Sequence, residues 1–171
     1  MPVRLTREHL QQMLLQARTE APKECCGFLL GTGNVVAEVV PVRNVAEEPG
    51  FAVDGPELGI RDPELARDPT KVYRMDPTGQ LKADRMAFER GWEIIAIYHS
   101  HPATRAYPSA TDQALAHWFE PRYVIISLAD DERPDVRAFR ITERTDGNGT
   151  RIRNSDGQTV KDVTEEDIVV I

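Results

Sequence analysis

The sequence predicts an α/β domain of the α+β kind, in which a mixed β-sheet is flanked by helices in three layers. The main observation is the order of its segments, because amphipathic helical patterns at residues 7–20 and 77–90 are interspersed with short apolar runs typical of strands. The second observation is length, since 171 residues suffice for one domain with a proper core and are too few for two. We therefore expect a single domain over residues 1–171.

The N-terminal part predicts a helix followed by a hairpin. Thr6 is the expected N-cap of the helix at 7–20, and Pro22 is its stop. Two strands follow, Cys25–Leu30 and Val35–Val42, joined by a Gly-Thr-Gly-Asn sequence typical of a hairpin. The two cysteines are neighbours on the first strand and point to opposite faces, so we expect them to be reduced and half-buried rather than paired or bound to zinc.

The remaining elements follow from turn and cap residues. Residues 44–71 are rich in Pro, Gly, Asp and Glu and predict a long loop. Asp76-Pro77 begins the helix at 77–90, which Gly91 ends. Strands are expected at Tyr123–Leu128 and Val136–Ile141. Residues 143–171 predict a C-terminal hairpin extension, with Ile168–Ile171 pairing at a sheet edge.

The stretch from Ile94 to Asp112 carries the strongest functional signal. An apolar run ends in the sequence His99-Ser100-His101-Pro102. Side chains alternate along a strand, so the two histidines leave its end on the same face, and Pro102 turns the chain away. Further on, Ser109 and Asp112 form a capping box that opens a helix of about residues 110–118. Two imidazoles, one carboxylate and one hydroxyl are thus expected around one point.

This set of side chains suits zinc. A catalytic zinc ion takes three protein ligands and keeps a fourth position open, and His99, His101 and Asp112 would be the three. Each fragment alone is more often structural, because His-x-His pairs occur by chance and a Ser-x-x-Asp helix start is common. The combination is more specific, since strand end, proline exit and helix cap occur in the order that a metal site needs.

These residues resemble the signature of the JAMM, or MPN+, zinc metalloproteases. The family also uses a glutamate in a Pro-x-Glu-x-Cys-Gly-x-Leu-Leu-Gly-like stretch, and this chain has PKECCGFLLG at residues 22–31. The resemblance covers residues 1–142 and implies a cytidine-deaminase-like three-layer fold. It implies that Glu24 is the general acid and base, and that Ser109 donates to the developing oxyanion. Without the resemblance, Glu24 would be read as an exposed carboxylate at a strand entry and Ser109 as an N-cap alone.

The resemblance also implies a substrate class. Its best-known members cleave isopeptide bonds to ubiquitin, and prokaryotic relatives act on ubiquitin-like and sulfur-carrier proteins. We therefore expect hydrolysis of the bond after a carrier's C-terminal Gly-Gly, with the loop at 44–74 contacting the substrate. The nature of that bond stays open: it is a peptide, an isopeptide or an amino-acid adduct.

Two alternative functions remain, a catalytically inactive MPN interaction module and a RadC-like protein linked with DNA repair. The intact ligand set disfavours the first, and the segment around Glu24 disfavours the second. A zinc nucleoside deaminase is excluded, because its H-x-E and P-C-x-x-C motifs are absent.

The composition narrows the partners. A net charge of −7 and a pI near 5.1, without a basic run, argue against a nucleic-acid partner. Hydrophobic residues make up 40% of the chain without a stretch as long as a membrane span, so no membrane partner is expected. No signal peptide is visible, which predicts a cytoplasmic protein. A monomer and a homodimer are both compatible with the sequence.

Overall fold

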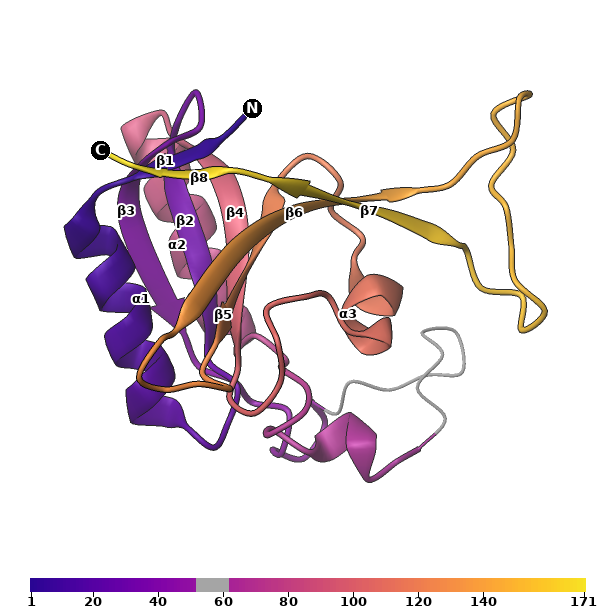
Figure 1. Cartoon of the computed structure of the whole chain (residues 1–171), viewed down its shortest axis with the longest axis horizontal. Coiled ribbons are helices and arrows are strands. Elements are labelled where there is room, and N and C mark those ends of the chain that lie inside the picture. Colours follow the sequence, from indigo (N-terminus) through magenta and orange to yellow (C-terminus); the bar gives the residue numbers. More distant parts are fainter. Residues whose placement is uncertain (52–61) are drawn as a thin grey trace.

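The computed structural model describes residues 1–51 and 62–171. Its strands are β1 Val3–Leu5, β2 Cys26–Thr32, β3 Val35–Val42, β4 Glu93–His101, β5 Arg122–Ser127, β6 Asp135–Glu143, β7 Lys161–Glu166 and β8 Ile168–Val170. Its helices are α1 Arg7–Glu20, α2 Pro77–Arg90, α3 Ala110–Leu115 and the short 3-10 helix η2 Leu65–Arg67. Within the described ranges the strands form one mixed sheet in the order β7-β6-β5-β4-β2-β3-β1-β8 (Figure 1).

Helices α1 and α2 begin and end where their cap residues predict. The side chain of Thr6 accepts the amide of His9 at 3.2 Å, and that of Asp76 accepts the amide of Thr78 at 3.0 Å. Gly91 ends α2 with φ 65°, a left-handed conformation that suits glycine. The predicted bounds of both helices are confirmed.

The two long helices cover opposite faces of the sheet. On β2, Leu29 belongs to the core cluster that contains Met13 of α1. Its neighbour Phe28 belongs to the cluster that contains Ala83 and Ala87 of α2. Adjacent strand residues point to opposite faces, so α1, the sheet and α2 form three layers, and the predicted architecture is confirmed (Figure 1).

Strand β4 lies in the middle of the sheet and places the end of its histidine motif beside the start of β2. It pairs antiparallel with β2, with Cys26 opposite His99, and parallel with β5. Just beyond this pairing, the amide of Ser100 donates to the carbonyl oxygen of Cys25 at 3.0 Å. The amide of Cys25 donates in turn to the hydroxyl of Ser100 at 2.7 Å. The residue before Cys25 is therefore held next to the histidines.

One continuous segment joins the two ends of the sheet. Strands β7 and β8 are separated only by Asp167, yet β7 pairs with β6 and β8 pairs with β1. Glu166 accepts from the guanidinium groups of Arg122 at 2.7 Å and Arg140 at 3.2 Å. Arg122 also donates to the carbonyl oxygen of Met1 at 3.3 Å. The C-terminal segment thereby fastens the N-terminal strand to the rest of the sheet.

Several details differ from the sequence predictions. Helix α3 ends at Leu115 rather than 118, because Ala116 is extended and the hydroxyl of Tyr123 donates to the carbonyl oxygen of Trp118 at 2.9 Å. Strand β1 was not predicted. Strand β7 lies within the expected C-terminal hairpin region at 143–171, and the edge pairing at 168–171 is confirmed by β8. The two cysteines are free, as expected, but fully rather than half buried.

The expected loop at 44–71 is only partly visible. Residues 52–61 of it lie outside the described residues. Its described part contains the 3-10 helix η2, and an isolated bridge pairs Asn44 with Met75. Among the described residues, no helix has both the length and the apolar character needed to cross a bilayer.

Candidate metal centre

The two histidines that end β4 meet at their ring nitrogens. Their Nε2 atoms are 3.1 Å apart, and His99 and His101 are 1% and 5% exposed. The Nδ1 atom of His101 lies 2.8 Å from the carbonyl oxygen of Arg105. A carbonyl only accepts, so this contact places the proton on Nδ1 and leaves the Nε2 lone pair facing the centre. The predicted convergence of the histidines is present.

Asp112 brings a carboxylate to the same point. Its Oδ2 atom lies 3.2 Å from Nε2 of His99 and 3.1 Å from Nε2 of His101. The predicted capping box holds it there, because the amide of Ser109 donates to Oδ2 at 2.8 Å and the amide of Asp112 donates to the Ser109 hydroxyl at 3.0 Å. The turn that begins α3 therefore also aims the carboxylate.

These three atoms fit a small cation. Their mutual separations of 3.1 to 3.2 Å form a nearly equilateral triangle. Ligand atoms at 2.0–2.1 Å from a tetrahedral zinc lie about 3.3 Å from one another, which is close to this spacing. Three lone-pair atoms buried this near each other repel unless a proton or a cation lies between them. Two imidazoles and a carboxylate are also a donor set that zinc accepts.

The charges of the cluster support the same conclusion. Burial raises the pKa of Asp112, but the charge of His99 and hydrogen bonds from both histidines outweigh this and hold the pKa well below its usual range. Burial lowers the pKa of His101, yet its hydrogen bond to Asp112 raises it on balance. The carboxylate is thus kept ionised by the two histidines that surround it.

Glu24 lies at the border of the triangle. It is 4% exposed, and a carboxylate oxygen of Glu24 lies within 4.8 Å of ring nitrogens of His99 and His101. The two histidines could therefore bind a metal ion together with either Glu24 or Asp112, and the atoms of the set with Asp112 lie closer together. Burial, followed by the charges of Asp112 and Asp68, raises the pKa of Glu24 to about 9. Its Oε1 atom has no hydrogen-bond partner among the described residues. The interpretation of Glu24 as an exposed carboxylate is therefore wrong.

Asn44 connects Glu24 to the segment that follows the long loop. Its amide nitrogen donates to the backbone carbonyls of Glu24 and Val72, each at 3.0 Å. Its carbonyl oxygen accepts from the amides of Ala46 at 3.1 Å and Arg74 at 3.0 Å. The side chain is thus held on both its donor and acceptor sides. No spacing or period in the sequence marks this residue, and its role was not predicted.

Tyr73 belongs to the segment that Asn44 holds. Its ring stacks on the imidazole of His99, with the centroids 4.6 Å apart and the planes 24° apart. This contact packs one side of a metal-ligand candidate against an aromatic ring. Tyr73 lies in a stretch without periodicity, so no sequence pattern indicates this contact.

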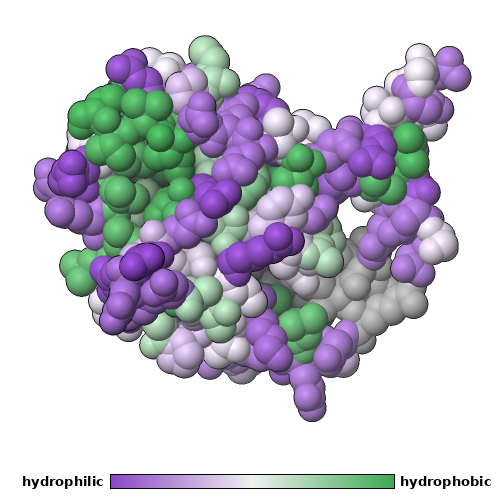
Figure 2. Space-filling view, viewed as in Figure 1, coloured by the Kyte–Doolittle hydropathy of each residue, from purple (hydrophilic) through white to green (hydrophobic). Residues whose placement is uncertain are grey.

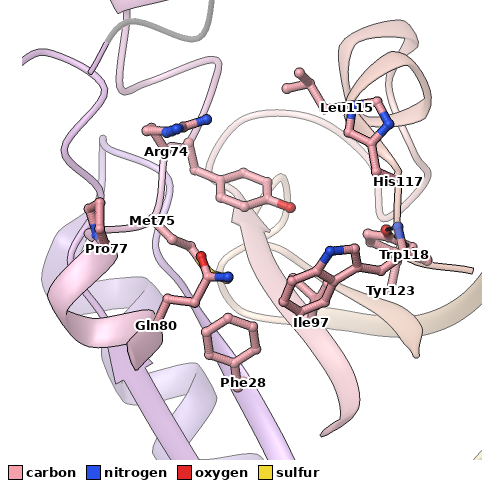
Figure 3. Close-up of a pocket in the computed structure, with 11 residues that line it drawn as sticks. Phe28, Arg74, Met75, Pro77, Gln80, Ile97, Leu115, His117, Trp118 and Tyr123 are labelled. Atoms are coloured by element: carbon pink, nitrogen blue, oxygen red, sulfur yellow. Dashed lines mark hydrogen bonds between the residues drawn. The ribbon is translucent and has the colours of Figure 1, made fainter. Parts of the chain in front are cut away.

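A mainly apolar cavity of about 310 Å³ adjoins Tyr73 (Figure 3). In the close-up, Phe28 and Ile97 lie at its floor, and Ile97 is two residues before His99 on the same strand face. One wall comes from the start of α2 and the residues before it, namely Arg74, Met75, Pro77 and Gln80. The other runs from the end of α3 to β5 and consists of Leu115, His117, Trp118 and Tyr123. We call this space the aromatic pocket.

Solved structures resemble the whole chain. A solution structure of a protein from Desulfitobacterium hafniense is 31% identical, covers 98% of this chain and 92% of its own, and has a TM-score of 0.66. The crystal structure of a JAB1/MPN domain protein from Archaeoglobus fulgidus is 17% identical, with 98% of both chains covered and a TM-score of 0.50. The chain therefore has a JAB1/MPN-type fold, and this fold holds a buried candidate metal centre.

The family follows from the sequence comparison. The model of the prokaryotic homologues of the JAB domain matches residues 6–142, and the chain belongs to this family. The CysO-cysteine peptidase of Mycobacterium tuberculosis is 37% identical over 132 residues, 77% of each chain. A desampylase of Haloferax volcanii is 31% identical over 68% of this chain and 70% of its own. A probable TtuB-protein conjugate cleaving protease of Thermus thermophilus is 34% identical over 81% and 70%.

Proposed function

We propose that this protein is a zinc-dependent peptidase or isopeptidase that hydrolyses the bond after the C-terminal Gly-Gly of a ubiquitin-like or sulfur-carrier protein. The observation that carries the proposal is the triangle of two imidazole nitrogens and one carboxylate oxygen. Beside it lies Glu24, whose Oε1 atom has no hydrogen-bond partner among the described residues. The relatives support the substrate class, since their names refer to peptidases and conjugate-cleaving enzymes that act on CysO or TtuB.

In this proposal His99, His101 and Asp112 hold the zinc ion. When bound, zinc supplies Lewis acidity that polarises a carbonyl and lowers the pKa of water from 15.7 to about 7. The Arg105 carbonyl keeps His101 in the tautomer that presents Nε2. The Ser109 amide and hydroxyl hold the carboxylate of Asp112 and its backbone.

Glu24 transfers protons in this proposal. A carboxyl with its pKa raised to about 9 by burial and neighbouring carboxylates takes up a proton readily. It accepts a proton from the attacking water and delivers it to the leaving amine, and Oε1 has no competing partner among the described residues. The hydrogen bond from the Asn44 side chain to the backbone carbonyl of Glu24 holds the proton carrier in position.

Ser109 stabilises the developing oxyanion. Its hydroxyl oxygen already accepts the amide of Asp112, and within residues 1–51 and 62–171 the hydroxyl proton has no acceptor, so it can donate to the substrate. The residue is exposed at the start of α3, where a substrate can reach it. Capping and catalysis therefore use different parts of one hydroxyl group.

The aromatic pocket is the proposed path of the carrier's tail towards the metal centre. Its contact with Tyr73 places it beside His99, and its mainly apolar walls suit an extended segment with apolar side chains. One of these walls includes Arg74, which lies in the predicted substrate-contacting loop at 44–74.

The remaining properties extend this proposal. One domain spans residues 1–171, and the enzyme works in the cytoplasm, where its two free cysteines stay reduced. It works as a monomer or a homodimer and needs neither nucleic acid nor a membrane. A RadC-like role would instead require DNA binding, and an inactive interaction module would bind the carrier without cleaving it.

A cleavage assay tests the proposal. The zinc-loaded protein is incubated with Gly-Gly-linked carrier fusions, with CysO carrying a C-terminal cysteine, and with denatured casein. We expect release of the group after Gly-Gly and little digestion of casein. Efficient casein digestion with intact carrier fusions would refute the substrate class, and carrier binding without any cleavage would favour the inactive module.

A further inference from the structure

The β6–β7 hairpin carries a projection at residues 144–160, which we call the arm. Figure 1 shows it extending away from the sheet, beyond α3. It contains two tight turns, and the side chains of Asp146 and Asn154 each accept backbone amides within their turn. The family match ends at residue 142, so the arm lies outside the matched region.

The base of the arm is held by three backbone hydrogen bonds. The amide of Arg144 donates to the carbonyl of Val160 at 2.8 Å, that of Ile152 to Arg144 at 2.9 Å, and that of Val160 to Ile152 at 2.9 Å. Each of the three residues therefore bonds to the other two. Both turns start from this closed set, which gives the arm a defined shape.

The side chains of the arm are open to contact with another molecule. Residues 144–157 are all exposed, and Figure 2 shows mostly hydrophilic side chains on the arm. The arm's backbone hydrogen bonds and turns give it its shape without burying these side chains. They are therefore available to a partner.

A cavity of about 420 Å³ lies between the arm and α3. On the side of α3 it is lined by Gln113, Ala114 and His117. On the side of the arm it is lined by Arg153, Asn154, Gln158 and Thr159. The hydrogen-bonding side chains on both sides of this cleft offer partners for the main chain of a polypeptide.

This cleft and the aromatic pocket have one lining residue in common. His117, which follows α3 and is exposed, lines both cavities. The aromatic pocket in turn includes Tyr73, whose ring stacks on His99. The candidate metal centre, the aromatic pocket, the C-terminal end of α3 and the arm thus follow one another as neighbours.

We propose that the arm and α3 form a docking surface for the ubiquitin-like or sulfur-carrier substrate, upstream of the tail that reaches the metal centre. This inference rests on the proposed function and names the part of the same substrate that the cleft holds. The arm contributes affinity for the carrier and takes no part in the chemistry.

The pairing of β6 with β7 allows a clean deletion. Glu143 pairs with Lys161 in the last rung of the hairpin, so an Asn-Gly turn in place of residues 144–160 joins two paired strands. A second variant, Gln158→Trp, fills the cleft while leaving the arm in place. Its matched control is Asn148→Trp, which adds the same side chain to the other turn, where the residue does not line the cleft.

Two measurements decide the proposal. The first is the Kd of the zinc-loaded protein for a Gly-Gly-ended carrier; the second is kcat and KM on the carrier fusion and on a short peptide with the same tail. In the deletion and in Gln158→Trp, we expect Kd and KM for the carrier to rise about tenfold or more, as for loss of an interface hot spot. In these two variants we expect kcat and the hydrolysis of the short peptide to stay within about twofold of wild type, since neither depends on the docking contact. In the Asn148→Trp control we expect every measured value to stay within about twofold of wild type.

The outcomes separate the two proposals. Unchanged carrier affinity in the deletion overturns the arm as a docking surface, as does an equal loss of peptide hydrolysis. Arm-dependent carrier binding without any cleavage supports the arm and overturns the hydrolytic function. If the wild-type protein does not bind the carrier, both proposals are overturned.

Discussion

The metal centre draws His99, His101 and Asp112 from one short stretch of chain, whereas the segment at 143–171 contacts strands from both ends of the sequence. The first region gathers buried charge at one point. The second closes a sheet and carries the exposed arm. Loss of one group from the metal centre should abolish metal binding or catalysis. Loss of part of the C-terminal segment should instead lower the stability of the fold. The following predictions test this separation, from the largest expected effect to the smallest.

The largest effect is expected for the double change His99→Ala/His101→Ala. Removing both imidazoles leaves Asp112 as the last member of the triangle, so metal content and cleavage should both fall to background. Elemental analysis beside the cleavage assay checks this. Zinc retained at the wild-type ratio would remove the two histidines from the ligand set.

Glu24→Gln should separate metal binding from turnover. The amide has nearly the same shape as the carboxyl but cannot accept the proton, so kcat should fall by about 10²–10⁴-fold. Zinc content and the unfolding midpoint should stay close to wild type, because Glu24 lies outside the tight triangle. Activity within a few-fold of wild type would exclude Glu24 as the proton carrier.

Deleting residues 168–171 should show the reverse pattern. The change removes β8 and the bond from the Ile171 amide to the Leu5 carbonyl, which exposes the buried side chains of β1. We expect a loss of about 2–4 kcal/mol in the free energy of unfolding, as for other disruptions of buried networks. Metal content and kcat of the folded fraction should remain. Urea unfolding measures the change in the free energy of unfolding. A parallel loss of metal affinity would show that the C-terminal segment and the metal centre are coupled.

Asn44→Asp probes the connection between Glu24 and the loop. The change keeps the acceptor oxygen for Ala46 and Arg74 but removes the donor to Glu24 and Val72, at an expected cost of about 1–3 kcal/mol in stability. kcat should fall more than KM rises, because the backbone of Glu24 loses its anchor. Equal kinetics at full metal content would make Asn44 purely structural.

The smallest effect concerns Glu166. Burial raises its pKa, but hydrogen bonds from Arg122 and Arg140 outweigh this and lower it. A lowered folded-state pKa means that the carboxylate stabilises the protein above its unfolded-state pKa, and that this contribution is lost as the pH falls. Glu166→Gln should therefore cost roughly 1 kcal/mol at neutral pH and flatten the loss of stability between about pH 5 and 3. Parallel acid-unfolding curves would show that the ion cluster contributes nothing.

The sequence anticipated what short-range patterns encode. The caps Thr6, Asp76 and Ser109 placed their helix starts, and strand alternation placed His99 and His101 on one face. Each of these features depends on residues within a few positions of one another. The helix bounds and the approach of the histidines to Asp112 could therefore be predicted.

The features that the sequence did not reveal depend on distant contacts. Strand β1 has three residues, too few to show a period, and β7 reads KDVTEE, whose charges conceal its pairing with β6. Tyr73 and Asn44 lie where no repeat marks them, and their partners are side chains or carbonyls elsewhere in the fold. Such residues become visible only when the backbone has been placed.

The shared segment of β7 and β8 bears on how the protein matures during synthesis. Strand β1 is made first, yet its hydrogen-bonded neighbour β8 is made after every other strand of the described sheet. Until β8 has been synthesised, the edge of β1 that pairs with it stays exposed in the nascent chain, and unpaired strand edges favour association with other chains. Completion of the sheet is thus a late event, and the arm leaves the ribosome only shortly before it.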